Sequence, residues 1–263
     1  MSETIKVPTM AEYMAEGKKP EVLFWVGCAG SFDDRAKKIT KAFVKLLHHA
    51  GVDFAVLGTE ESCTGDPAKR AGNEFLFQMQ AVTNIEVLNG YEIKKIVTAC
   101  PHCFNTIKNE YPVLGGSYEV MHHTQFLKSL LDEGKLTVEG GQFKGKRITF
   151  HDPCYLGRGN GVYEAPRDLL HKLEVELIEM KRCKSKGFCC GAGGAQMFKE
   201  PEPGNKDVNI ERTEEALETN PDVIAAGCPF CNTMMTDGVK NKEKENSIEV
   251  LDVAEMIASA KDL

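Results

Sequence analysis

The sequence predicts an α/β fold built from two duplicated halves, each with a Rossmann-like parallel sheet. Short apolar runs rich in β-branched residues alternate with longer segments of helical periodicity, a pattern typical of parallel strands joined by right-handed helical crossovers. Two of these runs each lead into a Cys-Pro-x-Cys motif, within Lys94–Pro112 and within Asp222–Lys240. Parallel sheets of this kind bind ligands beyond the carboxyl ends of their strands, so we expect the functional residues there.

The duplication is visible in landmarks that recur in the same order. The segment Glu21–Gly30 matches Lys146–Gly157, and Tyr118–Leu130 matches Ile248–Ala260. The separations between successive cysteine landmarks are 35 and 37 positions in the first half and 35 and 39 in the second, counted from Cys28, Cys63 and Cys100 and from Cys154, Cys189 and Cys228. A Gly/Lys-rich stretch at 139–146 marks the boundary. We therefore expect an N-terminal extension over 1–20 and two domains over 21–140 and 146–263.

Within the first half, each expected element rests on local pattern. The run VLFWVG is strand-like, and the helix after it has apolar residues at 39, 43, 46 and 47. The longer helix that follows has apolar residues at 75, 76, 79, 82, 85 and 88. In chain order we expect a strand over 22–27, a helix over 33–50, a strand over 53–58, a helix over 73–89 and a strand over 94–99. The second half should repeat this order.

Composition and charge narrow the class of protein. The formal net charge of −7 argues against nucleic acid as the main partner, because phosphate binding needs a basic surface. No apolar run approaches the length of a membrane-spanning helix, and the first twenty residues lack the apolar core of a signal peptide. We therefore expect a cytoplasmic protein that meets a membrane only indirectly, through a complex.

The chain has ten cysteines, at a spacing that favours metal binding or redox chemistry over disulfides. Buried free thiols that act as small apolar side chains are the plainer alternative. The fold should gather the first set at one sheet edge and the second set at the other. The first set is Cys28, Cys63, Cys100 and Cys103, and the second is Cys154, Cys189, Cys190, Cys228 and Cys231. Cys183 has no counterpart in the duplication, and its role is left open.

The residues alone leave three kinds of site open. Structural zinc takes four tetrahedral ligands, which suits the first set, whereas the five thiols of the second set are one too many. Five is also one more than an ordinary cubane cluster takes. A thioredoxin-like reductase needs a single Cys-x-x-Cys motif. The glycines around Cys189 and Cys190, in SKGFCCGAGG, would let the backbone approach a bulky cofactor.

These motifs together resemble the cysteine-rich CCG domain, which occurs in pairs in the B and D subunits of heterodisulfide reductase and in iron–sulfur subunits of the glycolate oxidase type. The resemblance covers about residues 21–263. HDPCYLGR, FCCGAGG and CPFC are similar to the second domain of that family, and EESCTGDPAKRAGNEF and CPHCFNTIKNEYP look most like its D-type members.

The resemblance implies a noncubane [4Fe-4S] cluster held by the second set of cysteines. It implies either disulfide cleavage or relay of electrons towards quinone. The sequence departs from the family in two ways. Thr64 follows Cys63 where a second cysteine is expected, so the first half is left with a second iron–sulfur cluster, zinc or an empty site as alternatives. The chain also has no ferredoxin-type run of four cysteines, so electrons would enter from a separate protein of the complex.

We therefore expect an iron–sulfur oxidoreductase subunit of a complex. It would pass electrons between a ferredoxin-like or flavoprotein partner and a thiol/disulfide or quinone-linked acceptor. The expected reactive residues are Cys189, Cys190 and His151, the last either hydrogen-bonding the cluster or delivering a proton. A zinc or iron–sulfur scaffold protein without turnover is the alternative, and a dithiol reductase using Cys100 and Cys103 is a third hypothesis.

Overall fold

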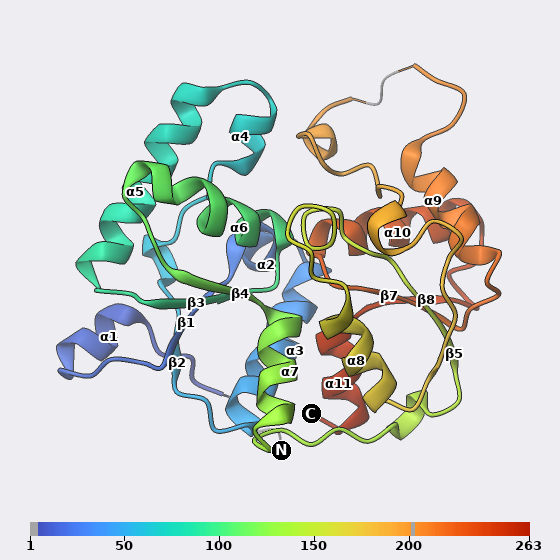
Figure 1. Ribbon diagram of the computed structural model, residues 1–263, viewed down its shortest axis with the longest axis horizontal. Helices are drawn as coiled ribbons and strands as arrows, with labels where there is room; N and C mark the ends of the chain where they lie inside the picture. Colours follow the sequence, from blue (N-terminus) through green and yellow to red (C-terminus); the bar gives the residue numbers. More distant parts are fainter. Residues whose placement is uncertain (1–4, 201–202) are drawn as a thin grey trace.

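The structure is a computed structural model that describes residues 5–200 and 203–263, and these residues form two four-stranded parallel sheets. The strands of the first sheet are ordered β2-β1-β3-β4, and those of the second β6-β5-β7-β8. The second order repeats the first, and every pairing is parallel. The predicted α/β fold with two duplicated parallel-sheet halves is confirmed (Figure 1).

The first half carries seven of the described helices. In chain order its elements are α1 (Met10–Ala15), β1 (Val22–Trp25), α2 (Gly27–Phe32), α3 (Ala36–His49), β2 (Phe54–Ala55), α4 (Asp66–Arg70), α5 (Glu74–Gly90), β3 (Lys95–Thr98), α6 (Pro101–Asn105), β4 (Glu119–His122) and α7 (His123–Asp132). A π-helical turn, Thr106–Glu110, continues α6.

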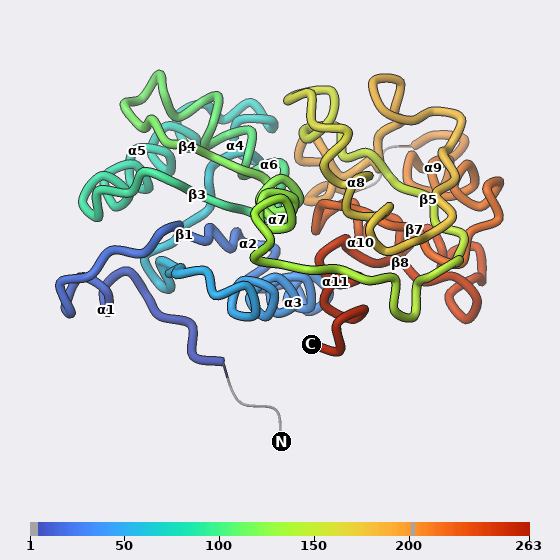
Figure 2. The backbone as a smooth tube through the Cα atoms, turned by 60° about the horizontal axis from the view of Figure 1, so that its bottom comes forward, coloured from blue at the N-terminus to red at the C-terminus, as the bar shows by residue number. Residues whose placement is uncertain are grey.

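The second half repeats the pattern with fewer described helices and a longer loop before α9. Its elements are β5 (Arg147–Phe150), α8 (Glu164–Lys172), β6 (Glu176–Leu177), α9 (Val208–Leu217), β7 (Val223–Ala226), α10 (Pro229–Asn241), β8 (Glu249–Asp252) and α11 (Val253–Ala260). The chain crosses from one half to the other along the segment between α7 and β5 (Figure 2).

The second strand is shorter than expected. Residues 53–58 were predicted to be a strand, but β2 has two residues and a 3-10 turn follows at Gly58–Glu60. The reason is local: after β2 the chain pairs with the N-terminal segment, where Met10 N donates to Val56 O and Val56 N donates to Pro8 O. Cys63 therefore follows this turn and not a strand end.

The two halves share one apolar core. Buried residues of β1, α3 and α7 pack in the same cluster as those of β5, α8 and α11. Figure 1 shows α3, α7, α8 and α11 gathered together beside the sheets. Arg35 closes this junction, because its guanidinium pairs with Glu255 at 2.7 Å and donates to Val250 O at 2.8 Å. The strands of the first sheet precede the Gly/Lys-rich stretch 139–146, and those of the second sheet follow it. The limits of the two domains stay a prediction.

Among the residues that the structure describes, no helix combines the length and the apolar character that crossing a bilayer requires.

Close packing of α9 against α10 depends on Gly238. A Cβ at this position would overlap the hydroxyl of the buried Thr213, and it would lie 3.3 Å from Asn209 O. We predict that Gly238→Ala lowers the free energy of unfolding by about 2 kcal/mol, because overpacking forces the helices apart. The measurement is urea unfolding of the reduced protein. Gly90→Ala is the control: a Cβ there meets nothing within 4 Å, so it should be neutral or stabilising by up to about 1 kcal/mol. Equal losses in both variants would contradict the packing argument.

Candidate metal centre

The structure brings the five cysteines of the second half together. The thiols of Cys154 and Cys189, of Cys189 and Cys190, and of Cys228 and Cys231 lie close enough to shift each other's pKa values. The Sγ atoms of Cys190 and Cys231 are 3.3 Å apart and complete the chain of contacts. The turn after β5, the loop before α9 and the start of α10 therefore deliver five thiols to one place.

The glycines beside the adjacent cysteines shape this loop. Gly191 has a φ of +91°, in the left-handed region, and its N–H donates to Cys189 Sγ at 3.3 Å. A Cβ at this position would lie 3.1 Å from Val208 Cβ, so a larger residue would press on α9. Gly191 thus allows one turn both to hold a sulfur and to pass close to a helix.

The first half repeats this geometry with one thiol replaced. The thiols of Cys28 and Cys63, and those of Cys100 and Cys103, lie close enough to shift each other's pKa values. Thr64 contacts Cys103 through its hydroxyl at 3.9 Å, just as Cys190 contacts Cys231. Thr64 therefore takes the position of the fifth thiol, and the first set is a four-thiol version of the second.

The two sets meet across the junction of the halves. Cys100 is the N-cap residue of α6 and Cys228 that of α10, and their thiols lie close enough to shift each other's pKa values. Seven of the ten cysteines are linked in this way, and Cys28, paired with Cys63, lies near enough to Cys100 for their charges to interact, so nine cysteines form one array. Cys183 stands apart and is partly exposed.

Hydrogen bonds among the thiols separate their pKa values. A bond from Cys28 lowers the pKa of Cys63 to about 7, and bonds from Cys103 and Cys154 hold the pKa values of Cys100 and Cys189 below the ordinary range. The pKa values of the donating thiols shift upwards instead: donation to Cys189 raises the pKa of Cys190 to about 12. Each set therefore favours a thiolate stabilised by neighbouring thiols, and the thiolate is the form that binds metal.

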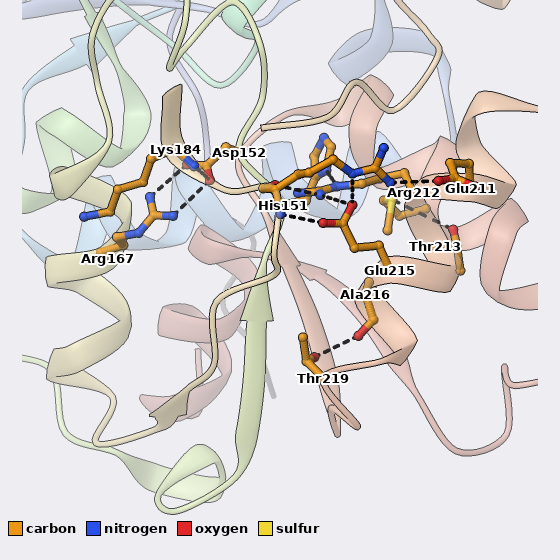
Figure 3. A network of polar contacts seen from close by, with 12 residues as sticks. His151, Asp152, Arg167, Lys184, Glu211, Arg212, Thr213, Glu215, Ala216 and Thr219 are labelled. Carbon is orange, nitrogen blue, oxygen red and sulfur yellow. Dashed lines mark hydrogen bonds and ion pairs between the residues drawn. The ribbon is translucent and has the colours of Figure 1, made fainter. Parts of the chain in front are cut away.

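His151 lies against the second set. One of its ring nitrogens and the Sγ atoms of Cys190 and Cys231 fall within 4.8 Å of one another, and all three side chains are buried. Its Nδ1 accepts a hydrogen bond of 3.0 Å from Arg212 Nε (Figure 3). Burial, reinforced by the charge of Arg212, lowers the pKa of His151 to about 3, so the ring is neutral.

A buried ion pair holds the turn that carries His151 and Cys154. Arg167 is 3% exposed and binds both carboxylate oxygens of Asp152, at 2.8 and 2.9 Å (Figure 3). The same carboxylate accepts from Lys184 N at 2.7 Å, which ties the turn to the start of the loop that bears the adjacent cysteines.

Other side chains hold the first set in place. Glu61 accepts hydrogen bonds from Val26 N at 3.0 Å and Gly27 N at 2.6 Å, at the turn that bears Cys28. Burial raises the pKa of Glu61 to about 7 against these two bonds. Asn84 is fully buried and donates to Cys63 O at 2.9 Å.

His102 packs between aromatic rings. Its ring lies 4.7 Å from that of Tyr155 and 5.3 Å from that of Phe230, and its Nδ1 is 2.8 Å from Asp66 Oδ2. Asp66 lies 36 positions before His102 in the chain, so this contact joins two separate elements of the first half.

A cleft of about 360 Å³ opens beside Cys28 of the first set. Cys28 forms one wall, and Phe230, between the two cysteines of the second CPFC motif, forms another. Its remaining lining is mostly apolar and includes Phe32, Met197 and Phe198. A cleft of this size and lining suits a small organic molecule.

Comparison with known families agrees with this geometry. The profile of the cysteine-rich domain, CCG, matches residues 22–108 and 148–236, one copy in each half. The chain belongs to the CCG family. The resemblance to this family seen in the sequence is therefore confirmed, and each matched range covers the cysteines of one set.

Curated relatives of this CCG chain are named for redox proteins. It is 50% identical over 256 residues to a probable iron-sulfur-binding oxidoreductase, FadF, of Bacillus subtilis, covering 97% of this chain and 36% of the relative. It is 48% identical to the EtfAB:quinone oxidoreductase of Syntrophomonas wolfei, covering 93% and 35%. It is 36% identical to the D subunit of the heterodisulfide reductase of Methanosarcina barkeri, covering 92% and 59%. The chain thus spans little more than a third of the first two relatives.

Sequence reasoning found the cysteines but missed their supports. Arg212, Arg167, Glu61 and Asn84 were not singled out, since each lies in an ordinary polar stretch of the sequence. Only Glu61 could have been suspected of a role at the site, because it precedes Cys63 by two positions in the sequence. Nothing in the sequence around Arg212 distinguishes it from a surface residue of an amphipathic helix.

The Arg167–Asp152 pair should matter more for stability than an exposed arginine. We predict that Arg167→Ala lowers the free energy of unfolding by about 3 kcal/mol, because Asp152 would remain buried without its counter-ion. Arg147→Ala is the control, since that side chain is 41% exposed in its pair with Glu176 and should cost at most about 1 kcal/mol. Urea unfolding of the two variants under reducing conditions tests this, and a loss for Arg167→Ala no larger than that for Arg147→Ala would count against it.

Proposed function

We propose that this chain is the electron-transfer part of an iron–sulfur oxidoreductase, with a noncubane [4Fe-4S] cluster held by the second set of cysteines. The observation that carries the proposal is the gathering of all five thiols at one place, with Cys190 and Cys231 in direct contact and the others near enough to shift their neighbours' pKa values. A tetrahedral zinc or a cubane cluster would leave one of them unused. The names of the curated relatives, an iron-sulfur-binding oxidoreductase among them, support the same chemistry.

Buried polar atoms around the thiols fit such a group. Within the described residues, His151 Nε2 and both amide atoms of Asn232 are buried without a hydrogen-bond partner, and Asn232 follows Cys231 directly. Unpaired buried polar groups are rare in folded proteins unless a bound group or water satisfies them. Inorganic sulfides accept hydrogen bonds and would satisfy the N–H groups.

The first set suits a second metal group. Its four thiols, Cys28, Cys63, Cys100 and Cys103, match the ligand number of a cubane cluster or of zinc. Cys100 of the first set contacts Cys228 of the second set. A redox group held by the first set would therefore lie beside the cluster of the second set, at electron-transfer distance.

In this function the chain supplies binding, exclusion of water and orientation. A bound cluster would supply one-electron chemistry at its iron atoms. Cys100, Cys103, Cys190, Cys228 and Cys231 are at most 5% exposed, so the chain keeps water from most of the sulfur ligands. The apolar cleft between Cys28 and Phe230 binds the acceptor, a disulfide or a quinone-type molecule.

Partners follow from the same proposal. Electrons enter from a ferredoxin-like protein or from a flavoprotein, as the name of the EtfAB:quinone oxidoreductase relative suggests. The basic tract Lys181–Gly187 is a surface on which an acidic partner can dock.

The alternatives are weaker on specific grounds. A dithiol reductase working through Cys100 and Cys103 needs thiols that a disulfide can reach, and these are only 3% and 5% exposed. A zinc scaffold remains the competing function, and it differs from the redox proposal in its metal and in its need for Cys190.

Metal analysis separates these functions. Anaerobically purified protein should contain iron and sulfide in equal amounts, about four of each for one cluster and about eight if the first set is loaded. Cys190→Ser should change or abolish the EPR signal seen after mild oxidation, because the second set loses a ligand. Cys183→Ser is the matched control and should leave the signal intact. Zinc without sulfide, not replaced on iron–sulfur reconstitution, would overturn the proposal.

A reciprocal exchange tests the difference between the halves. Thr64→Cys gives the first half a fifth thiol, and Cys190→Thr gives the second half a four-ligand set. We predict that Cys190→Thr abolishes the signal of the five-thiol cluster, whereas Thr64→Cys creates a second signal of that type. EPR of both variants after iron–sulfur reconstitution measures this. Identical spectra for wild type and Cys190→Thr would show that the fifth thiol has no role.

A further inference from the structure

Arg212 is a fully buried guanidinium that holds His151. Its Nε donates to His151 Nδ1 at 3.0 Å, and its Nη1 donates to Arg182 O and to Glu215 Oε2, both at 2.9 Å (Figure 3). Arg212 and His151 are 0% exposed, and Glu215 is 6% exposed. Arg212 directly precedes Thr213, the residue of α9 that packs against Gly238 of α10.

This bond determines which nitrogen of His151 carries hydrogen. A guanidinium donates hydrogen bonds and cannot accept them, so Nδ1 must be the accepting, unprotonated nitrogen. The single hydrogen of the neutral ring is then on Nε2. Nε2 is buried and has no partner among the described residues, and the ring lies within 4.8 Å of the thiols of Cys190 and Cys231. An Nε2 that carries hydrogen has no lone pair for a metal, but it can donate to sulfur.

The equivalent position in the first half independently indicates an N–H donor. Trp25 occupies the position of His151 in the first half, three residues before Cys28 as His151 is before Cys154. Its side chain is 0% exposed and packs in the cluster that includes Cys100 and Cys103. Its Nε1 is also buried without a partner among the described residues, and an indole N–H can only donate. Both halves therefore have a buried N–H donor at this position.

The charge around Arg212 is only partly balanced. Glu215 is shared between Arg212 and Arg182, whose Nε donates to it at 2.8 Å. Glu211 also binds Arg182, at 2.9 Å, but it is 40% exposed, and Asp152 is occupied by Arg167. Burying a guanidinium is unfavourable unless it is fully paired, so Arg212 brings an incompletely compensated positive charge next to His151.

We propose that Arg212 is a positioning residue that fixes His151 as an N–H donor to sulfur at the second set of cysteines, and thereby raises the reduction potential of the cluster there. The inference rests on the proposed function. A reduced cluster carries more negative charge than an oxidised one, so a donor to its sulfur and a nearby buried cation stabilise the reduced state.

Potentiometric titration of the anaerobic holoprotein, followed by EPR, tests the effect on potential. Arg212→Met and His151→Phe should each lower the midpoint potential of the second centre, with iron and sulfide contents unchanged. The double variant should fall by less than the sum of the two, because the two residues act partly through one hydrogen bond. Arg212→Lys keeps the charge and a donor and should retain most of the wild-type potential. Arg147→Gln, on the same strand as the His151 turn but at its far end, should leave the potential unchanged.

A measurement on the unmodified protein keeps the inference testable if a variant fails to fold. Pulsed EPR of the wild-type holoprotein labelled with ¹⁵N-histidine should give a weak nitrogen coupling and an exchangeable proton near sulfur. A strong coupling would identify His151 as a metal ligand and overturn the inference. An unchanged potential in Arg212→Met with full iron content would overturn it as well, while leaving the proposed function standing. Protein that takes up no iron would overturn both.

Discussion

The contact between Cys100 and Cys228 is the constraint around which the molecule is arranged. Each of the two cysteines is the N-cap residue of the helix that follows the third strand of its half, β3 or β7. Two parallel sheets can bring these caps together only if their carboxyl edges face one another. The shared apolar core of α3, α7, α8 and α11 and the Arg35–Glu255 pair hold the halves in that arrangement. The continuity of the cysteine array therefore depends on packing remote from any sulfur.

Divergence between the halves is concentrated at equivalent positions. Cys190 is matched by Thr64, and both contact the last cysteine of their own set. Asp252 is matched by His122, and each begins a helix with a capping box. His123, next to His122, bonds Asp252 at 2.8 Å with both side chains fully buried, so the duplicated positions also interlock. Duplication preserved the backbone framework, and substitution made the two centres chemically unequal.

Much of the site could be predicted because its ligands obey a simple rule. The carboxyl ends of parallel strands meet at one edge, so cysteines placed after strands must converge, and their spacing in the sequence was enough to assign the two sets. The prediction of strand ends was less accurate where a segment remote in the sequence pairs with the strand. The strand expected over 53–58 ends at Ala55, because the chain around Pro8 and Met10 pairs with Val56. A local pattern holds no information about such a partner.

The sequence by itself determined the fold class, the duplication, the family and the two sets of cysteines. Each of these depends on short-range periodicity or on the order of residues along one chain. Only the tertiary structure decided that the sets touch, that Thr64 takes the place of a thiol and that Arg212 faces His151. These relations join residues that lie 39 to 128 positions apart in the chain. The energy of burying a guanidinium or of pairing two thiols depends on which groups surround them in space, and sequence spacing does not record that.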